Sequence, residues 1–290
     1  MLWFVLTIIS ALAMTLQDVF SKKIADSTGT LLVAWLRWSS SVPFLLLCLP
    51  FVTVPHLSVE FYLTTGILIP LDVFALVLYM KAIRISPLNV TLPFLSLTPI
   101  IMILTGYLFL GETLGPAQIA GIFFIAAGAY LINIHTIKDG ILQPILSISK
   151  EKGSLLMIVV ALIYGVTGTL GKKAVVLSDP LFFGVSYTVL LSVAMTPILF
   201  WLGPSRKVSE GRIRRSWVII VLLGLVGAVN VITHFFAIRL VEAATMIAVK
   251  RTSLLFGVLF GRLVFDEPHF RARFIGAALM AAGVVTVYLF

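Results

Sequence analysis

Residues 104–112 read LTGYLFLGE, and residues 259–267, 155 positions further along, read LFGRLVFDE. The same shift of 155 aligns residues 79–131 with residues 234–286 without a gap. The matched charged and glycine residues are Arg84 with Arg239, Glu112 with Glu267, Gly121 with Gly276 and Gly128 with Gly283. A shift of 150 places Lys22-Lys23 on Lys172-Lys173. Chance matches of Ala and Leu are common in apolar sequence, but matched charges and glycines are not, so we infer an internal repeat.

The composition excludes an ordinary soluble protein. Of the 290 residues, 60% are hydrophobic and only 11% are charged, whereas soluble domains have about 45–50% apolar and about 25% charged residues. Cys48 is the only cysteine and the four histidines lie far apart, so we expect no intrachain disulfide, no metal site and no cofactor. The net charge of +9 is typical of basic cytoplasmic loops in a membrane protein, so the expected partner is the lipid bilayer and not nucleic acid.

Ten stretches are long and apolar enough to be spanning helices, which need about 20 residues each. They are residues 2–21, 31–51, 61–80, 88–110, 117–135, 154–174, 181–202, 217–238, 243–265 and 270–290. Residues 1–135 form the first repeat, 136–153 a linker and 154–290 the second repeat. Because each repeat has an odd number of spans, the second enters the membrane with the opposite orientation. The predicted fold is an all-α integral membrane protein, a monomer with ten transmembrane helices as two inverted five-helix repeats around a central cavity.

Short motifs recur at equivalent places in the two repeats. Lysine pairs end the first span of each repeat, and Arg37 lies in the second span. The further motifs are Leu97-Thr98-Pro99, Gly111-Glu112-Thr113-Leu114 and Phe265-Asp266-Glu267. With them the chain resembles the drug/metabolite transporter superfamily, in the ten-span form built from two EamA domains. The resemblance implies transport of small solutes, not catalysis, in a prokaryotic inner membrane. It fixes no substrate, because the superfamily carries amino acids, sugars, nucleotide sugars, sugar phosphates and cationic drugs.

Lys250 and Arg251 lie inside the ninth span. Each basic residue at a helix centre costs about 2.5–3.5 kcal/mol, so the pair must face a wet cavity, an acidic partner or a ligand. The pair resembles the Lys-Arg pair with which the plastid phosphate translocators hold a substrate phosphate, and this implies an anion site. The symmetric positions of the first repeat hold Leu95 and Ser96. The alternative is an internal ion pair with Asp18 or Asp72.

Other polar residues inside the spans are candidates for substrate contact or coupling. Asn230 and His234 are four residues apart and share a helix face, and Tyr79 is the symmetric equivalent of His234. We expect them, with Ser96, to contact a polar solute, although interhelical hydrogen bonds would explain each alone. Asp72 has two interpretations, a proton-coupling carboxylate or a counter-charge to Lys250 or Arg251. Asp18 is a further candidate charge partner, and its spacing favours a local pair with Lys22.

The predicted function is secondary active transport of a small metabolite by alternating access. The chain has no G-x-x-x-x-G-K-[ST] motif for ATP, so exchange or an ion gradient, with protons as the candidate ion, would supply the energy. The favoured substrate is a phosphorylated or carboxylated anion bound between the repeats. The alternative is proton-coupled export of neutral or cationic amphiphiles or amino acids. A membrane-embedded enzyme is less favoured, because no metal triad or nucleophile–base pair is visible.

The orientation in the membrane stays open. Basic residues gather on the side of the loops that contain residues 136–153 and 203–216, and the charge rule places that side in the cytoplasm with both termini outside. Members of the superfamily with ten spans are commonly drawn with both termini inside.

Overall fold

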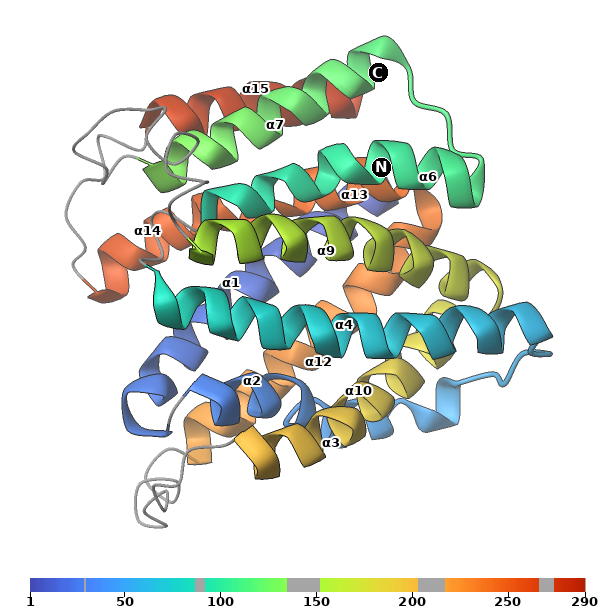
Figure 1. The fold of residues 1–290 in the computed structure, drawn as a ribbon. Helices are drawn as coiled ribbons and strands as arrows, with labels where there is room; N and C mark the ends of the chain where they lie inside the picture. The colour runs from blue at the N-terminus through green and yellow to red at the C-terminus, as the bar shows by residue number, and fades with distance from the viewer. Residues whose placement is uncertain (29, 87–91, 135–151, 203–216, 266–273, 290) are drawn as a thin grey trace.

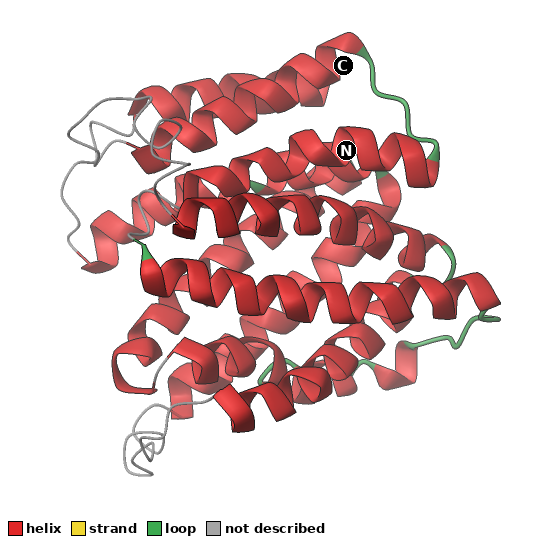
Figure 2. Ribbon diagram, in the orientation of Figure 1, coloured by secondary structure: helices red, strands yellow, loops and turns green. Residues whose placement is uncertain are grey.

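The computed structural model describes residues 1–28, 30–86, 92–134, 152–202, 217–265 and 274–289. Those residues form helices and connecting turns, with no strand among them (Figure 2). The helices are α1 (Leu2–Thr28), α2 (Thr30–Ser39), α3 (Val42–Leu46), η1 (Leu49–Phe51), α4 (Val59–Ile85), η2 (Leu92–Leu97), α6 (Thr98–Leu110), α7 (Pro116–Ile134), α9 (Lys152–Val176), α10 (Pro180–Leu202), α12 (Trp217–Leu240), α13 (Ala243–Lys250), α14 (Ser253–Phe265) and α15 (Phe274–Leu289). They follow the ten predicted spans in order, which confirms the all-α fold class.

Five of the described helices, α1, α4, α9, α10 and α12, are long and apolar enough to cross a membrane. Large apolar side chains such as Leu108, Val193 and Trp201 lie on the outside of the bundle. A helix satisfies its own backbone hydrogen bonds, which lipid cannot do, so apolar helices with apolar outer faces suit a bilayer. The chain is an integral membrane protein.

Three of the predicted spans are interrupted. The ninth span consists of α13 and α14, which are separated at Arg251 and Thr252. The fourth consists of the 3-10 helix η2 and the α-helix α6, which begins at Thr98 with Pro99 in its first turn. Proline has no N–H to give to a preceding turn, so it favours a helix start there. The second span breaks after α2, and Pro43 lies in the first turn of α3.

The helices lie in two layers with two closing edges (Figure 1). One layer contains α6, α9 and α4, and the layer behind it contains α13, α1 and α12. At one edge α7 lies beside α15, and at the other α2 and α3 lie near α10. The main contacts between the repeats come in equivalent pairs within each layer: α1 packs on α12, and their equivalents α9 and α4 also pack together. Equivalent helix pairs of this kind are expected when a pseudo-two-fold axis relates the two repeats.

The contact between α7 and α15 gives the direction of that symmetry. A Cβ on Gly121 would lie 2.9 Å from the carbonyl oxygen of Gly283, and one on Gly128 would lie 2.6 Å from that of Gly276. The earlier glycine of one helix faces the later glycine of the other, so the equivalent helices are antiparallel. Small residues at both crossing points let the two backbones approach closely, as in other membrane helix pairs.

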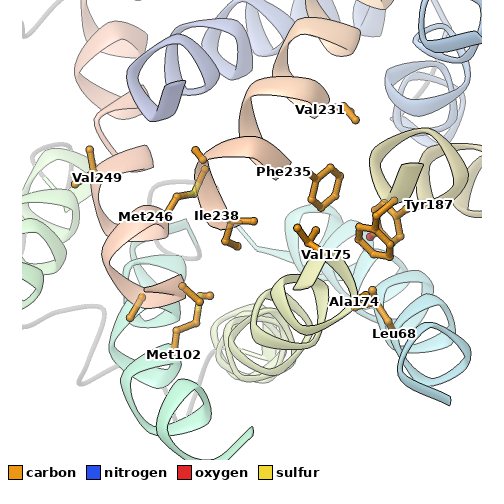
Figure 3. Packing of buried hydrophobic residues seen from close by; sticks show 14 of the residues in the cluster. Leu68, Met102, Ala174, Val175, Tyr187, Val231, Phe235, Ile238, Met246 and Val249 are labelled. Carbon is orange, nitrogen blue, oxygen red and sulfur yellow. The ribbon is translucent and has the colours of Figure 1, made fainter. Parts of the chain in front are cut away.

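The apolar core lies between the two repeats. Figure 3 shows Leu68 and Met102 from the first repeat near Val175, Tyr187, Phe235 and Met246 from the second. These side chains are almost fully buried. The repeats therefore share one core, and the candidate site lies at the same junction.

Candidate functional site

Lys250, the last residue of α13, points its ammonium group at α12. Its Nζ donates a hydrogen bond to Asn230 Oδ1 at 3.0 Å and lies 3.2 Å from His234 Nδ1. Three of the predicted site residues are thus neighbours, because the spacing of Asn230 and His234 places both on the face of α12 toward α13. Asn230 Oδ1 is an uncharged acceptor, so it holds the ammonium group without cancelling its charge.

Helix α1 adds two polar side chains to this cluster. Ser10 Oγ donates to Asn230 Oδ1 at 2.8 Å, and the Asn230 amide nitrogen donates to Gln17 Oε1 at 2.9 Å. Ser10 and Gln17 are buried. Their bonds fix the amide of Asn230 so that its oxygen faces Lys250. The sequence did not single out Ser10 or Gln17, although seven residues separate them, which is the spacing of one helix face.

Arg251 lies at the interruption between α13 and α14, where it caps α13. Among the described residues its side chain has no ion pair, and its Nε is buried without a hydrogen-bond partner. Tyr79 on α4 and Tyr164 on α9 lie within its electrostatic reach. Ser96, which precedes α6, is buried. The predicted residues Tyr79 and Ser96 therefore come from the first repeat, and Lys250 and Arg251 come from the second.

The two candidate carboxylates have partners other than the basic pair. Asp72 Oδ2 accepts a hydrogen bond from the Tyr187 hydroxyl at 2.5 Å, and Thr167 is a second side-chain partner. Asp18 pairs with Arg37 at 2.5 Å, although it lies within the electrostatic reach of Lys250. In the described part of the chain neither forms an ion pair with Lys250 or Arg251, so the counter-charge interpretation has no support there. The Lys22 side chain lies outside the described residues.

Glu112 joins three helices at the end of the bundle where α6 stops. Gly111, at φ 67°, turns the chain so that Glu112 folds back over α6. Glu112 forms an ion pair with Lys172 of α9, and its Oε2 accepts from the Ala243 N–H, at the start of α13, at 2.9 Å. Lys172 Nζ also donates to the Val241 carbonyl at 2.7 Å. We call Glu112, Lys172, Val241 and Ala243 the clasp.

A small pocket lies between α2, α4 and α10. Its lining is apolar except for the Trp35 indole, which donates a hydrogen bond to Thr196 at 3.1 Å. The lining residues are Leu31, Trp35, Leu76, Val77, Met195, Ile198 and Leu199. None of the predicted site residues is among them.

Comparison with known proteins adds a family and a fold. A family model described as the EamA-like transporter family matches residues 1–134 and again residues 151–289. Among solved structures, one whose title reads only "Crystal structure of protein" has a TM-score of 0.73 and 15% sequence identity, over 97% of this chain and 96% of that chain. At this identity the likeness shows the fold alone. No curated protein matches the chain.

Proposed function

Because the chain belongs to the EamA-like transporter family, and that family transports solutes across membranes, we propose that it carries a small anionic solute by alternating access between its two repeats. The observation that supports the anion is the pair of basic residues at the interruption of the ninth span. Their charge is not cancelled by any carboxylate among the described residues.

The chemistry of this pair suits an oxyanion. Lysine has three N–H donors and Lys250 has two side-chain partners, Asn230 and His234, so one donor is left for a ligand. Arginine offers a planar fork that matches carboxylate and phosphate oxygens. The buried Nε of Arg251 has no partner among the described residues. An anion would complete the hydrogen bonding of both residues and offset the cost of their burial.

The position of the pair suits alternating access. Transporters built from inverted repeats bind substrate where the repeats meet, at interrupted helices near the membrane centre. Here the interruption carries Lys250 and Arg251, while Tyr79 of the first repeat lies within electrostatic reach of Arg251. A solute held by residues of both repeats would be exposed to one side or the other as the repeats move. The energy would come from exchange or from an ion gradient.

A ligand-stabilisation screen on detergent-purified protein tests the proposal. The probes are inorganic phosphate, phosphorylated metabolites, carboxylates, amino acids and organic cations. A ligand at about 100 times its dissociation constant stabilises the fold by about 2.7 kcal/mol, which gives a measurable rise in melting temperature. We expect an anion to stabilise the wild type but not the double variant Lys250→Gln/Arg251→Gln.

The matched control is Lys173→Gln/Arg239→Gln, which removes two positive charges at the exposed ends of α9 and α12. This variant should keep the anion response. Stabilisation of the wild type and both variants by organic cations, with no response to any anion, would contradict the proposal. Uptake of the stabilising anion into proteoliposomes then tests transport itself.

A further inference from the structure

Asp72, Tyr187 and Thr167 form a second polar group inside the bundle, apart from Lys250, and Tyr187 and Thr167 are buried. Asp72 lies near the middle of α4, Tyr187 lies on α10 and Thr167 lies on α9. The Tyr187 hydroxyl donates to Asp72 Oδ2 at 2.5 Å, and Thr167 is the other side-chain partner of this carboxyl group. The carboxyl group therefore belongs to the first repeat and both hydroxyl groups belong to the second.

No positive charge pairs with Asp72 among the described residues. Arg37, on α2, pairs with Asp18, and Lys250 contacts Asn230 and His234. In the part of the chain that the structure describes, the titratable groups that face Asp72 from the neighbouring helices are the phenols of Tyr164 on α9 and Tyr187 on α10. An ionised carboxylate without a counter-charge is costly inside a membrane protein. This group is therefore suited to hold a proton, which removes that charge.

The hydroxyl partners suit both states of the carboxyl group. Tyrosine and threonine hydroxyls can donate to a carboxylate, and they can also accept from a protonated carboxyl group after rotating the O–H. The proton can therefore bind without a large movement of the three side chains.

The packing around Tyr187 favours a proton over a larger cation. The Tyr187 ring stacks on Phe183 at 5.4 Å between centroids and meets Phe235 at 5.9 Å and Trp38 at 6.0 Å. Tyr187 is 7% exposed and Phe183 is 1% exposed. Metal cations such as Mg²⁺ and Ca²⁺ take about six or more oxygen ligands. One carboxyl group and two hydroxyl groups in an aromatic surrounding do not supply them.

We propose that Asp72, with Tyr187 and Thr167, is the proton-binding site through which a proton gradient drives this transporter. The inference rests on the proposed function, because it supplies the energy for movement of the repeats. Movement of α4 against α9 and α10 would part Asp72 from its hydroxyl partners and let water reach the carboxyl group. The proton would enter from water on one side of the membrane and leave to water on the other.

Infrared difference spectroscopy in lipid nanodiscs, between acidic and alkaline buffer, tests the site without any substrate. We expect the carbonyl band of a protonated carboxylic acid in the wild type at acidic pH, and its loss in Asp72→Asn. Tyr187→Phe should keep the band at a shifted frequency, because one hydrogen bond to the carboxyl group is gone. The control Asp18→Asn should leave the band unchanged. A band that survives in Asp72→Asn, or that does not shift in Tyr187→Phe, would overturn the proposal.

Proteoliposomes test the coupling, with inorganic phosphate as the probe. A pH gradient should accelerate phosphate uptake by the wild type, and Asp72→Asn should lose this dependence on the gradient while still exchanging phosphate for phosphate. Gradient-driven uptake that survives in Asp72→Asn would overturn the coupling role. Absence of any phosphate binding or flux, with the infrared band intact, would instead count against the anion proposed for Lys250 and Arg251.

Discussion

In the ninth span the helix stops at Lys250 and restarts at Ser253, and in the fourth span η2 gives way to α6 at Thr98, the position equivalent to Ser253. The two interruptions have different surroundings. Lys250 contacts Asn230 and His234, and Asn230 in turn contacts Ser10 and Gln17 of α1. The fourth-span interruption instead packs in an apolar cluster that includes Phe94, Leu95, Tyr79 and Val160.

The repeat relates these surroundings residue by residue. Asn230 corresponds to Ala75 under the shift of 155, and Ser10 corresponds to Val160 under the shift of 150. Ala75 and Val160 are fully buried apolar residues. The shared backbone break thus comes with the fold, whereas the polar lining and the basic pair occur at only one of the two interruptions. The difference indicates that the break serves the movement of the repeats and that the chemistry of binding is concentrated at the ninth span.

The clasp connects these two interrupted helices, since Glu112 follows α6 and holds the start of α13. Lys172→Gln should therefore have the largest effect on stability. The side chains of Lys172 and Glu112 are 10% and 12% exposed, and loss of one partner of a buried ion pair costs about 3–5 kcal/mol. The neighbouring variant Lys173→Gln breaks a pair whose side chains are 27% and 56% exposed, and it should cost about 1 kcal/mol or less. Melting in detergent measures both.

Equal shifts for Lys172→Gln and Lys173→Gln would mean that the clasp carries no more than a surface ion pair. In that case the ends of α6 and α13 would be held together by packing alone.

Exchanging residues between the two interruptions tests directly whether their different surroundings give them different roles. Ser96→Arg places a charge in the apolar cluster and should lower stability by about 2.5–3.5 kcal/mol, the cost of a basic residue at a helix centre. Arg251→Ser should raise the stability of the ligand-free protein, because it removes a buried charge, and should abolish the stabilisation by an anion. Thermal melting with and without phosphate measures each effect, with Ser96→Ala as the control for loss of the native hydroxyl.

A fall in ligand-free stability for Arg251→Ser would show that Arg251 is a structural residue. The contrast between a polar site and an apolar counterpart would then describe packing and not binding.

The sequence predicts the repeat, the inverted topology and the ten spans, because charge, glycine and hydropathy patterns are local signals. It also predicts that Asn230 and His234 share a face, since that follows from helix geometry. The interruption at Arg251 could not be predicted, because no proline or glycine marks it and the ninth span is continuously apolar on either side. In the fourth span, by contrast, Pro99 marks the interruption in the sequence, because it lies in the first turn of α6.

The partners of the carboxylates were also beyond the sequence. Asp72 meets Tyr187 across 115 positions of the chain, and no pattern within one helix specifies which phenol or cation an intramembrane carboxylate will contact. The same holds for Glu112, whose motif marks the end of a span but not the helix start that it holds. Contacts between repeats depend on helix packing, which single-sequence periodicity does not contain.

Unlike the two helix interruptions, the antiparallel contact of α7 and α15 is alike in both repeats, so equivalent substitutions there should have equal effects. Gly128→Ala and Gly283→Ala should lower the melting temperature by the same amount, since each new Cβ would lie 2.6 Å from a carbonyl oxygen of the other helix. Overpacking of this kind costs about 1–3 kcal/mol. The control is Gly66→Ala on α4, where nothing lies within 4 Å, and it should be neutral or slightly stabilising because alanine favours a helix. Unequal effects at Gly128 and Gly283 would show that the two-fold relation does not extend to energetics.

Ser10→Ala should have the smallest effect on stability. It tests whether the hydrogen bonds from α1 only support the binding site or are themselves needed for binding. The variant removes one of two donors to Asn230 Oδ1, while Lys250 still donates to that oxygen and Gln17 still holds the amide nitrogen. One buried hydrogen bond contributes about 0.5–1.5 kcal/mol, so the melting temperature should fall only slightly. The response to phosphate should persist, because Lys250 and Arg251 are intact. Alanine at position 10 also makes α1 resemble α9, whose equivalent Val160 is apolar. Loss of the phosphate response in this variant would mean that the hydrogen bonds from α1, and not the basic pair alone, distinguish the binding interruption from its apolar counterpart.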